Sequence, residues 1–273
     1  MNTDLIFDIG MHRGEDTRFY LAKGFRVVAI EANPALCKEV SSLLAPEIRD
    51  RRLTVINAAI AEHRGKAQLF VNDTLTTWST LHAARARRNA RAGVSSYPIE
   101  VEAIRMEDVF ERFGIPYYMK VDIEGADWNC VEALHSIHDR PKYVSVEMNT
   151  IALGIPRRQI RQLAGLGYER FKIVSQLSVP RQREPNPPRE GRLTGCRFDV
   201  GSSGLFGADL PGNWMSADKA STACWRPSLS HMIVGADGVI RPSWPRFIRR
   251  PAERIFWRGI DWFDIHATMA RND

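Results

Sequence analysis

Cysteine is scarce in this sequence, and the few cysteines are not grouped. The four are Cys37, Cys130, Cys196 and Cys224, and no two of them have C-x-x-C spacing. This scatter argues against both a zinc site and a disulfide framework. We therefore expect no bound metal, and we expect a reducing compartment, the cytoplasm.

Long apolar runs are also missing. No stretch approaches the ~20 apolar residues that a membrane span needs, and the first short apolar run begins within a few residues of Met1. We expect neither a membrane span nor a signal peptide. The 273 residues, 44% of them hydrophobic and 26% charged, have the composition of a globular protein with a substantial core.

Acidic residues are outnumbered, which gives a net charge of +6 and a pI near 9.3. Two arginine clusters stand out, one over residues 85–91 and one over residues 246–258. Each cluster is open to three interpretations: a solvated face, a contact with an anionic acceptor such as a sugar phosphate, or sequence-tolerant nucleic-acid binding. No recognised nucleic-acid module supports the last of these.

The N-terminal stretch has the pattern of a strand, a tight turn and a helix. Leu5–Ile9 is a short apolar run, typical of a strand buried on both faces of a parallel sheet. Gly10 follows it, Gly14 opens a segment with helical spacing, and Gly24 ends that segment. In open α/β sheets, a ligand binds outside the carboxyl ends of the strands, at such a turn.

The missing glycine at position 12 indicates which cofactor binds here. A dinucleotide fingerprint needs a glycine where this chain has His12, and Asp8 would repel a pyrophosphate. A second buried strand ends at Glu31, about twenty residues past the turn, where a carboxylate accepts hydrogen bonds from a ribose. The pattern D-x-G-x-x-x-G therefore favours S-adenosylmethionine, a sulfonium cation, over NAD. The alternative is a turn whose glycines serve only packing.

The middle of the chain alternates between strands and helices, as in an α/β protein. Expected strands cover residues 52–60, 66–71 and 99–104, and expected helices begin at Pro34 and cover residues 106–113. Asn57, near the end of its strand, either bonds an adenine edge or caps the following turn. The polar segment 72–98 is either a lid over the site or a loop that contains a helix.

Charged residues gather on one face of the strand near Tyr117–Gly125. Alternation along the strand places Lys120, Asp122 and Glu124 on that face, where packing alone does not explain three charges. One account makes the two acids caps of the next helix, with Lys120 as their counter-ion. The other places them at the sheet edge, facing cofactor and acceptor. The strand at residues 142–149 repeats the pattern with Glu147.

These motifs resemble the FkbM-type methyltransferases. The resemblance rests on five segments of the sequence: Asp8-Ile-Gly-Met-His-Arg-Gly14, Glu31-Ala-Asn-Pro34, Asn57-Ala-Ala-Ile60, Lys120-Val-Asp-Ile-Glu-Gly-Ala126 and Val146-Glu147. It implies a Rossmann-like class I methyltransferase fold, a seven-stranded, mostly parallel sheet with helices on both faces and its last strand antiparallel. It also implies methyl transfer from S-adenosylmethionine, most often to a hydroxyl of a sugar, glycoconjugate or natural product.

The resemblance also implies roles for particular residues. Asp8, Gly10 and Gly14 would line the methionine end of the cofactor, and Glu31 would hold the ribose. The other predicted cofactor residues are His12, Thr17, Asn33 and Asn57. The family often has alanine and asparagine where this chain has Met11 and His12, so the pocket for the amino-acid end differs from the family's pattern. Asp122 is the leading candidate for the base or acceptor-orienting group, and Glu124 and Glu147 support it.

The C-terminal third changes in composition after a helix at Pro156 and a strand at residues 167–174. We expect a methyltransferase core over residues 1–177, an insertion over 178–256 and a returning last strand within 257–273. The insertion, which is rich in tryptophan, arginine, glycine and proline, is predicted to recognise the acceptor, with a glycine loop at Gly201–Gly207. His266 is an alternative base. Otherwise, the tryptophans fill a satellite core and His266 is structural.

The sequence thus predicts an S-adenosylmethionine-dependent O-methyltransferase that acts on a small-molecule or glycan hydroxyl, with an anionic acceptor as one alternative. A binding protein without catalysis, or one related to nucleic acids, on the same fold is the competing hypothesis.

Overall fold

The computed structural model describes most of the chain and divides it into two compact units. The described residues are 1–72, 78–91, 93–123, 125–150, 152–199, 201–234, 239–240, 250–251 and 261–269. The first unit comprises Met1–Val144, Glu184–Cys196 and Phe206–Asp209, and the second comprises Ser145–Arg183, Arg197–Leu205 and Leu210–Asp273. None of the helices in these described ranges is long and apolar enough to cross a membrane.

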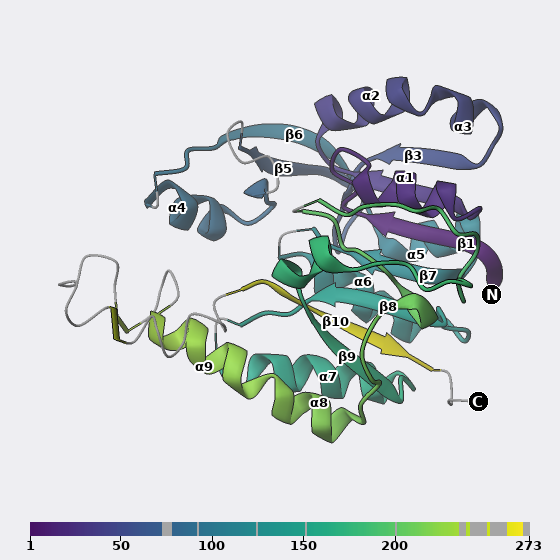
Figure 1. Ribbon diagram of the computed structural model, residues 1–273. Coiled ribbons are helices and arrows are strands. Elements are labelled where there is room, and N and C mark those ends of the chain that lie inside the picture. The colour runs from purple at the N-terminus through teal and green to yellow at the C-terminus, as the bar shows by residue number, and fades with distance from the viewer. Residues whose placement is uncertain are drawn as a thin grey trace. The chain divides into compact units, whose positions relative to one another are not determined.

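Strands and helices alternate along the first unit (Figure 1). Its elements are β1 (Asn2–Ile9), α1 (Glu15–Ala22), β2 (Arg26–Glu31), α2 (Pro34–Leu43), α3 (Ala45–Arg49), β3 (Leu53–Asn57), β4 (Ala59–Ile60), β5 (Gly65–Val71), α4 (Ala83–Arg91), β6 (Tyr97–Ile104), α5 (Met106–Phe113), β7 (Pro116–Val121), α6 (Asp127–Ala133), η2 (Leu134–Ser136) and η4 (Gly207–Asp209). The strand β8 (Tyr143–Glu147) spans the boundary between the units. The second unit contains α7 (Ile155–Gly165), β9 (Arg170–Ser175), η3 (Gln176–Arg181), α8 (Ala217–Ala223), α9 (Trp225–Val234) and β10 (Phe263–Thr268).

The main sheet has seven strands in the order β3-β2-β1-β7-β8-β10-β9. β1 pairs in parallel with β2 and β7, and β2 pairs in parallel with β3. β10, the last strand in the sequence, runs antiparallel to β9. The expected seven-stranded, mostly parallel sheet with an antiparallel last strand is therefore confirmed.

The predicted single strand over residues 52–60 is wrong, because the chain changes sheets within it. β3 ends at Asn57, and the amide of Ala58 donates to the carbonyl of Glu31 across a distance of 3.1 Å. β4 then joins a second sheet of order β4-β6-β5, in which β5 and β6 pair antiparallel. The apolar pattern continues across the break because residues on both sides of it are buried, Leu53 before it and Ile60 after it.

The first unit is built around a cluster of buried aromatic rings. Tyr118 of β7 stacks on Phe206 with ring centroids 4.7 Å apart and an interplanar angle of 4°, and Tyr20 and Phe25 meet Phe206 edge-on. Phe206 lies in the predicted glycine loop Gly201–Gly207. This part of the loop packs in the core of the first unit, where such aromatic contacts add to burial.

A buried ion cluster attaches the segments after β9 to the end of α1. The ammonium of Lys23 lies 3.1 Å from Glu184 and 2.7 Å from Asp209, and all three side chains are almost fully enclosed. Asp209 also accepts the backbone amide of Arg189. Buried charges persist only when they are paired and hydrogen-bonded in this way.

In the second unit, β9 and β10 bring two buried basic side chains side by side. His266 of β10 pairs in register with Lys172 of β9, and their residues are 2% and 5% exposed. Burial, with a smaller contribution from the Lys172 charge, lowers the pKa of His266 to about 3. His266 therefore stays neutral at neutral pH.

This burial predicts that acid weakens the fold through His266. The pKa rises from about 3 in the folded chain to about 6.5 in the unfolded chain, so the unfolded chain takes up the proton first and stability falls as the pH drops below about 6. The free energy of unfolding, measured in urea, should decrease between about pH 6 and pH 4 in both proteins. The decrease should be smaller in His266→Gln than in the wild type, by up to about 1.4 kcal/mol per pH unit. His135→Gln, at an exposed position, serves as the control. Equal acid sensitivity of His266→Gln and the wild type would contradict the assignment.

Candidate functional site

The turn after β1 is held against the ends of β2 and β7. The amides of Gly10 and Met11 donate to the carbonyl of Ile30 over 2.8 and 3.1 Å. Gly10 has a φ of +84°, and a Cβ on it would lie 1.8 Å from the backbone oxygen of Asp122. Only glycine meets both demands, so this glycine brings the predicted cofactor turn into contact with the predicted catalytic strand.

Glu31, at the end of β2, is fixed by two backbone amides. One carboxylate oxygen accepts from His12 over 3.1 Å, and the other accepts from Asn33 over 2.8 Å. Burial raises the pKa of Glu31, and these two hydrogen bonds oppose the shift. A carboxylate oxygen accepts more than one hydrogen bond, so this carboxylate fits the hydroxyl pair of a ribose. The carboxylate at the end of β2 thus suits a ribose.

His12 has a left-handed backbone conformation that residues other than glycine rarely adopt. Its φ is 49°, and its ring Nδ1 lies 3.5 Å from Glu15 at the start of α1. A histidine in the left-handed region carries a modest conformational cost. Here that conformation aims its amide at Glu31.

Three further predicted cofactor residues have roles within the protein itself. Asn33 is the N-cap of α2 and accepts from the amide of Ala35, and Gly14 is the left-handed N-cap of α1. The side-chain amide of Asn57 donates to the carbonyls of Glu31 and Ala32 over 3.0 and 3.2 Å, which fastens β3 to the end of β2. Their contacts with a cofactor stay predictions.

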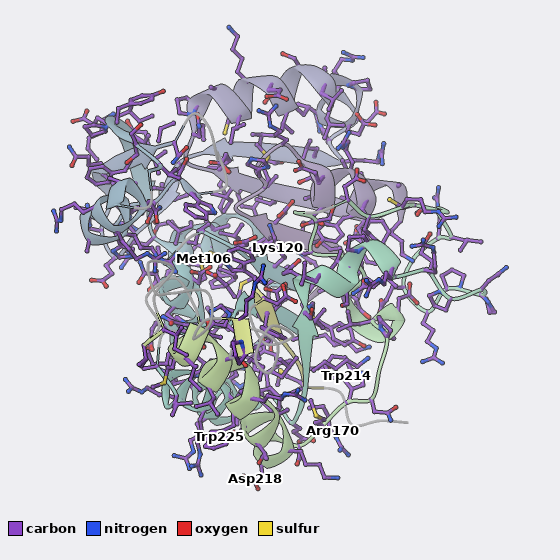
Figure 2. The ribbon with its side chains drawn as sticks, turned by 60° about the vertical axis from the view of Figure 1, so that its left-hand side comes forward. Met106, Lys120, Arg170, Trp214, Asp218 and Trp225 are labelled. Carbon is purple, nitrogen blue, oxygen red and sulfur yellow. The ribbon has the colours of Figure 1, made fainter. Side chains whose placement is uncertain are left out.

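Asp8 lies beneath the turn rather than on its surface. Its residue is 0% exposed, its Oδ2 accepts from the hydroxyl of Thr17 over 2.5 Å, and its Oδ1 lies 3.2 Å from the ammonium of Lys120. Figure 2 labels Lys120. Burial opposes the charge on Lys120, but the carboxylates of Asp8, Asp122 and Asp16 outweigh it and raise the pKa of Lys120. Asp8 and Thr17 therefore support the turn, and their predicted contact with the cofactor is untested.

Asp122 lies directly after β7, with 47% of its side chain exposed. The following helix, α6, has Ala126 as its N-cap residue and no side-chain cap hydrogen bond there, and Asp127 instead fixes the loop before the helix. The two carboxylate oxygens of Asp127 accept from the amides of Ile123 and Gly125 over 3.0 and 2.9 Å. The described residues thus show no cap hydrogen bond from Asp122 to α6, and its catalytic role stays a prediction. Glu124 lies outside the described residues.

The other two predicted catalytic residues belong to the second unit. Glu147 ends β8 and is half-buried, and its backbone carbonyl accepts from the side chain of Gln159 over 3.4 Å. His266 is enclosed in the sheet, and its low pKa makes it a poor base at neutral pH. Their catalytic roles stay predictions, and the burial of His266 argues against its role.

Sequence reasoning missed two acids. Asp16, in the first turn of α1, lies 3.8 Å from the ammonium of Lys120, and Asp127 shapes the loop after β7. A signal was present for both, because each is an acid in the first turn of a helix that follows a strand. Nothing in the sequence told which of the neighbouring acids would turn inward. Within the described ranges, no cluster of three or more metal-ligating side chains is found.

Comparison with known proteins identifies a family. Residues 8–169 match the family described as "Methyltransferase FkbM domain". No curated protein sequence matches the chain significantly.

Solved structures show only distant likeness. A SAM-dependent methyltransferase from Archaeoglobus fulgidus has 11% identity and a TM-score of 0.40, over 98% of this chain and 86% of that one. Another from Geobacter sulfurreducens, in complex with S-adenosyl-L-homocysteine, has 10% identity and a TM-score of 0.37, over 98% and 85%. A third from Thiobacillus denitrificans, also with S-adenosyl-L-homocysteine, has 8% identity and a TM-score of 0.38, over 98% and 86%. TM-scores this low add nothing to the family match.

The family match covers more than half of the 273 residues and includes Gly10, Glu31 and Asp122. The chain belongs to the FkbM family and is an S-adenosylmethionine-dependent methyltransferase.

Proposed function

We propose that this protein transfers a methyl group from S-adenosylmethionine to a hydroxyl of a sugar, glycoconjugate or natural product, and that Asp122 orients and deprotonates that hydroxyl. The observation that carries the proposal is the half-exposed carboxylate of Asp122. The backbone of this residue is in contact with the Gly10 turn. A carboxylate without a capping role, beside the cofactor turn, is suited to proton removal.

The bound cofactor supplies an activated methyl group, so the chain itself has two tasks. Glu31 and the Gly10 turn hold the cofactor in place, and Asp122 accepts the hydroxyl proton as the new carbon–oxygen bond forms and the carbon–sulfur bond breaks. Alignment of the reacting groups raises the rate of such a transfer, because their translational and rotational freedom is already lost on binding.

An anionic acceptor is supported by the position of α4. This helix carries Arg85, Arg87 and Arg88 and no acidic residue. A Cβ on Gly125 would lie 2.9 Å from the ring of His82 and 3.3 Å from the guanidinium of Arg85, so the start of α4 contacts the loop after Asp122. The guanidinium of Arg85 at this place suits a phosphate or carboxylate on the acceptor. Most of the second arginine cluster, over residues 246–258, lies outside the described residues.

We propose that only part of the expected insertion, residues 178–256, recognises the acceptor. Glu184–Cys196 and Phe206–Asp209 pack within the first unit, where Lys23 and the aromatic cluster hold them. The tryptophan-bearing remainder is the part proposed to recognise the acceptor.

Transfer of a radiolabelled methyl group to paired acceptors tests the function. Each neutral sugar is compared with its deoxy analogue at the methylated position and with its phosphate ester. We expect labelling only when the hydroxyl is present, and stronger labelling of the phosphate ester than of the neutral sugar. Labelling that persists in the deoxy analogues would overturn O-methylation, and a preference for neutral sugars would overturn the anionic acceptor.

Glu31 is expected to control the affinity for the cofactor product. A hydrogen bond to a charged group is worth about 1.5–3 kcal/mol, so Glu31→Ala should weaken binding of S-adenosylhomocysteine by roughly ten- to a hundredfold. Glu31→Gln keeps one acceptor oxygen and should lose less. Calorimetry measures both, with Glu47→Ala, in an ion pair on α3, as the control. Unchanged affinity in Glu31→Ala would remove Glu31 from the site.

Asp122→Asn keeps the shape of the side chain and removes its charge. Loss of a general base lowers turnover by about a hundredfold or more. We expect this loss of turnover, measured with an acceptor that the radiolabel assay identifies. The affinity for S-adenosylhomocysteine should change little. Asp139→Asn, at an exposed position of the same unit, should retain normal turnover. Near-normal turnover in Asp122→Asn would show that Asp122 is not the base.

A further inference from the structure

Lys120 is a buried charge in the centre of the first unit. Its side chain is 5% exposed, and it comes from β7, directly opposite Asp8 of β1 in the sheet register. A buried ammonium is costly unless every part of it is compensated. The surroundings of this ammonium therefore indicate what it is for.

The ammonium contacts four groups, one each from β1, the turn after β1, helix α1 and the residue after β7. It donates to the carbonyl of Gly10 over 2.8 Å and lies 3.2 Å from Asp8, 3.8 Å from Asp16 and 4.0 Å from Asp122. Asp8 belongs to β1, the Gly10 carbonyl to the predicted cofactor turn, and Asp16 to the first turn of α1. Asp122 directly follows β7. A simple counter-ion for Asp8 would need none of the other three contacts.

The Gly10 turn and Asp122, which Lys120 joins, are also in direct contact with each other. The amide of Asp122 donates to the carbonyl of Ile9 over 2.9 Å, and the backbone of Asp122 leaves no room for a side chain on Gly10. A shift of the Gly10 turn would therefore move Asp122, and the reverse. The Lys120 ammonium is the side-chain group that bridges both.

We propose that Lys120 is a positioning residue that holds the Gly10 turn and the Asp122 carboxylate in a fixed arrangement, so that cofactor binding and the placement of the base depend on one ammonium. This inference rests on the proposed function, because it assigns Lys120 to the same site. Lysine suits the role, since its ammonium has three donors on a flexible stem and reaches several acceptors at once.

Lys120→Met tests the proposal against a matched control. Methionine fills similar space without the charge. The control is Lys23→Met at the other end of α1, where the lysine is equally buried and also pairs with two carboxylates. Both variants should be less stable in urea. Only Lys120→Met should lose affinity for S-adenosylhomocysteine, by at least tenfold in calorimetry at low temperature.

A double variant separates positioning from charge neutralisation, and it guards against poor folding of Lys120→Met. The double variant Lys120→Met, Asp8→Asn lacks both charges of the closest ion pair. Its stability should therefore recover relative to that of Lys120→Met. If Lys120 positions the turn, the affinity of the double variant stays at least tenfold below that of Asp8→Asn alone. Equal affinity in the double variant and in Asp8→Asn would show that Lys120 only neutralises Asp8, and would overturn the inference.

The wild type separates this inference from the proposed function. Wild-type protein that fails to bind S-adenosylhomocysteine would overturn the proposed function together with the inference. Wild-type binding that is matched by Lys120→Met would overturn the inference alone.

Discussion

The buried ammonium of Lys120 is the interaction on which the carboxyl edge of the first unit depends. It stands between Asp8, Asp16 and Asp122, with the carbonyl of Gly10 as its closest partner. Three carboxylates close together repel one another, and in a low-dielectric interior that repulsion is strong. The lysine turns this repulsion into attraction, so three elements converge on one point.

A second buried lysine acts at the other end of α1. Lys23 pairs with Glu184 and Asp209, both from segments that come after β9 in the sequence. The helix α1 is thus held at its start through Asp16 and at its end through Lys23. The first cluster lies at the candidate site, and the second fastens later segments of the chain to the first unit.

The predicted strands and helices followed from local patterns wherever the apolar residues formed a short buried run or repeated with the period of a helix. β1, β2, α1, α5 and β10 lie where periodicity and glycines predicted them. The pattern failed at Ala58, because a strand that changes sheets keeps its apolar residues and shows no break in the sequence. It also could not show that Phe206 packs on Tyr118, a contact between residues far apart in the chain.

The sequence by itself determined which residues stand at the ends of the strands: Gly10, Glu31 and Asp122 follow apolar runs, and parallel strands bring their carboxyl ends to one edge. It also contains the motifs through which the chain resembles its family, and the family match over residues 8–169 rests on the sequence alone. Only the tertiary structure decided which acid does what. Asp8 and Asp16 turn inward to Lys120, Asp127 caps its own loop and Asp122 remains half-exposed. The physical reason is that the cost of burying a carboxylate depends on its partners, and those partners come together only when the chain folds.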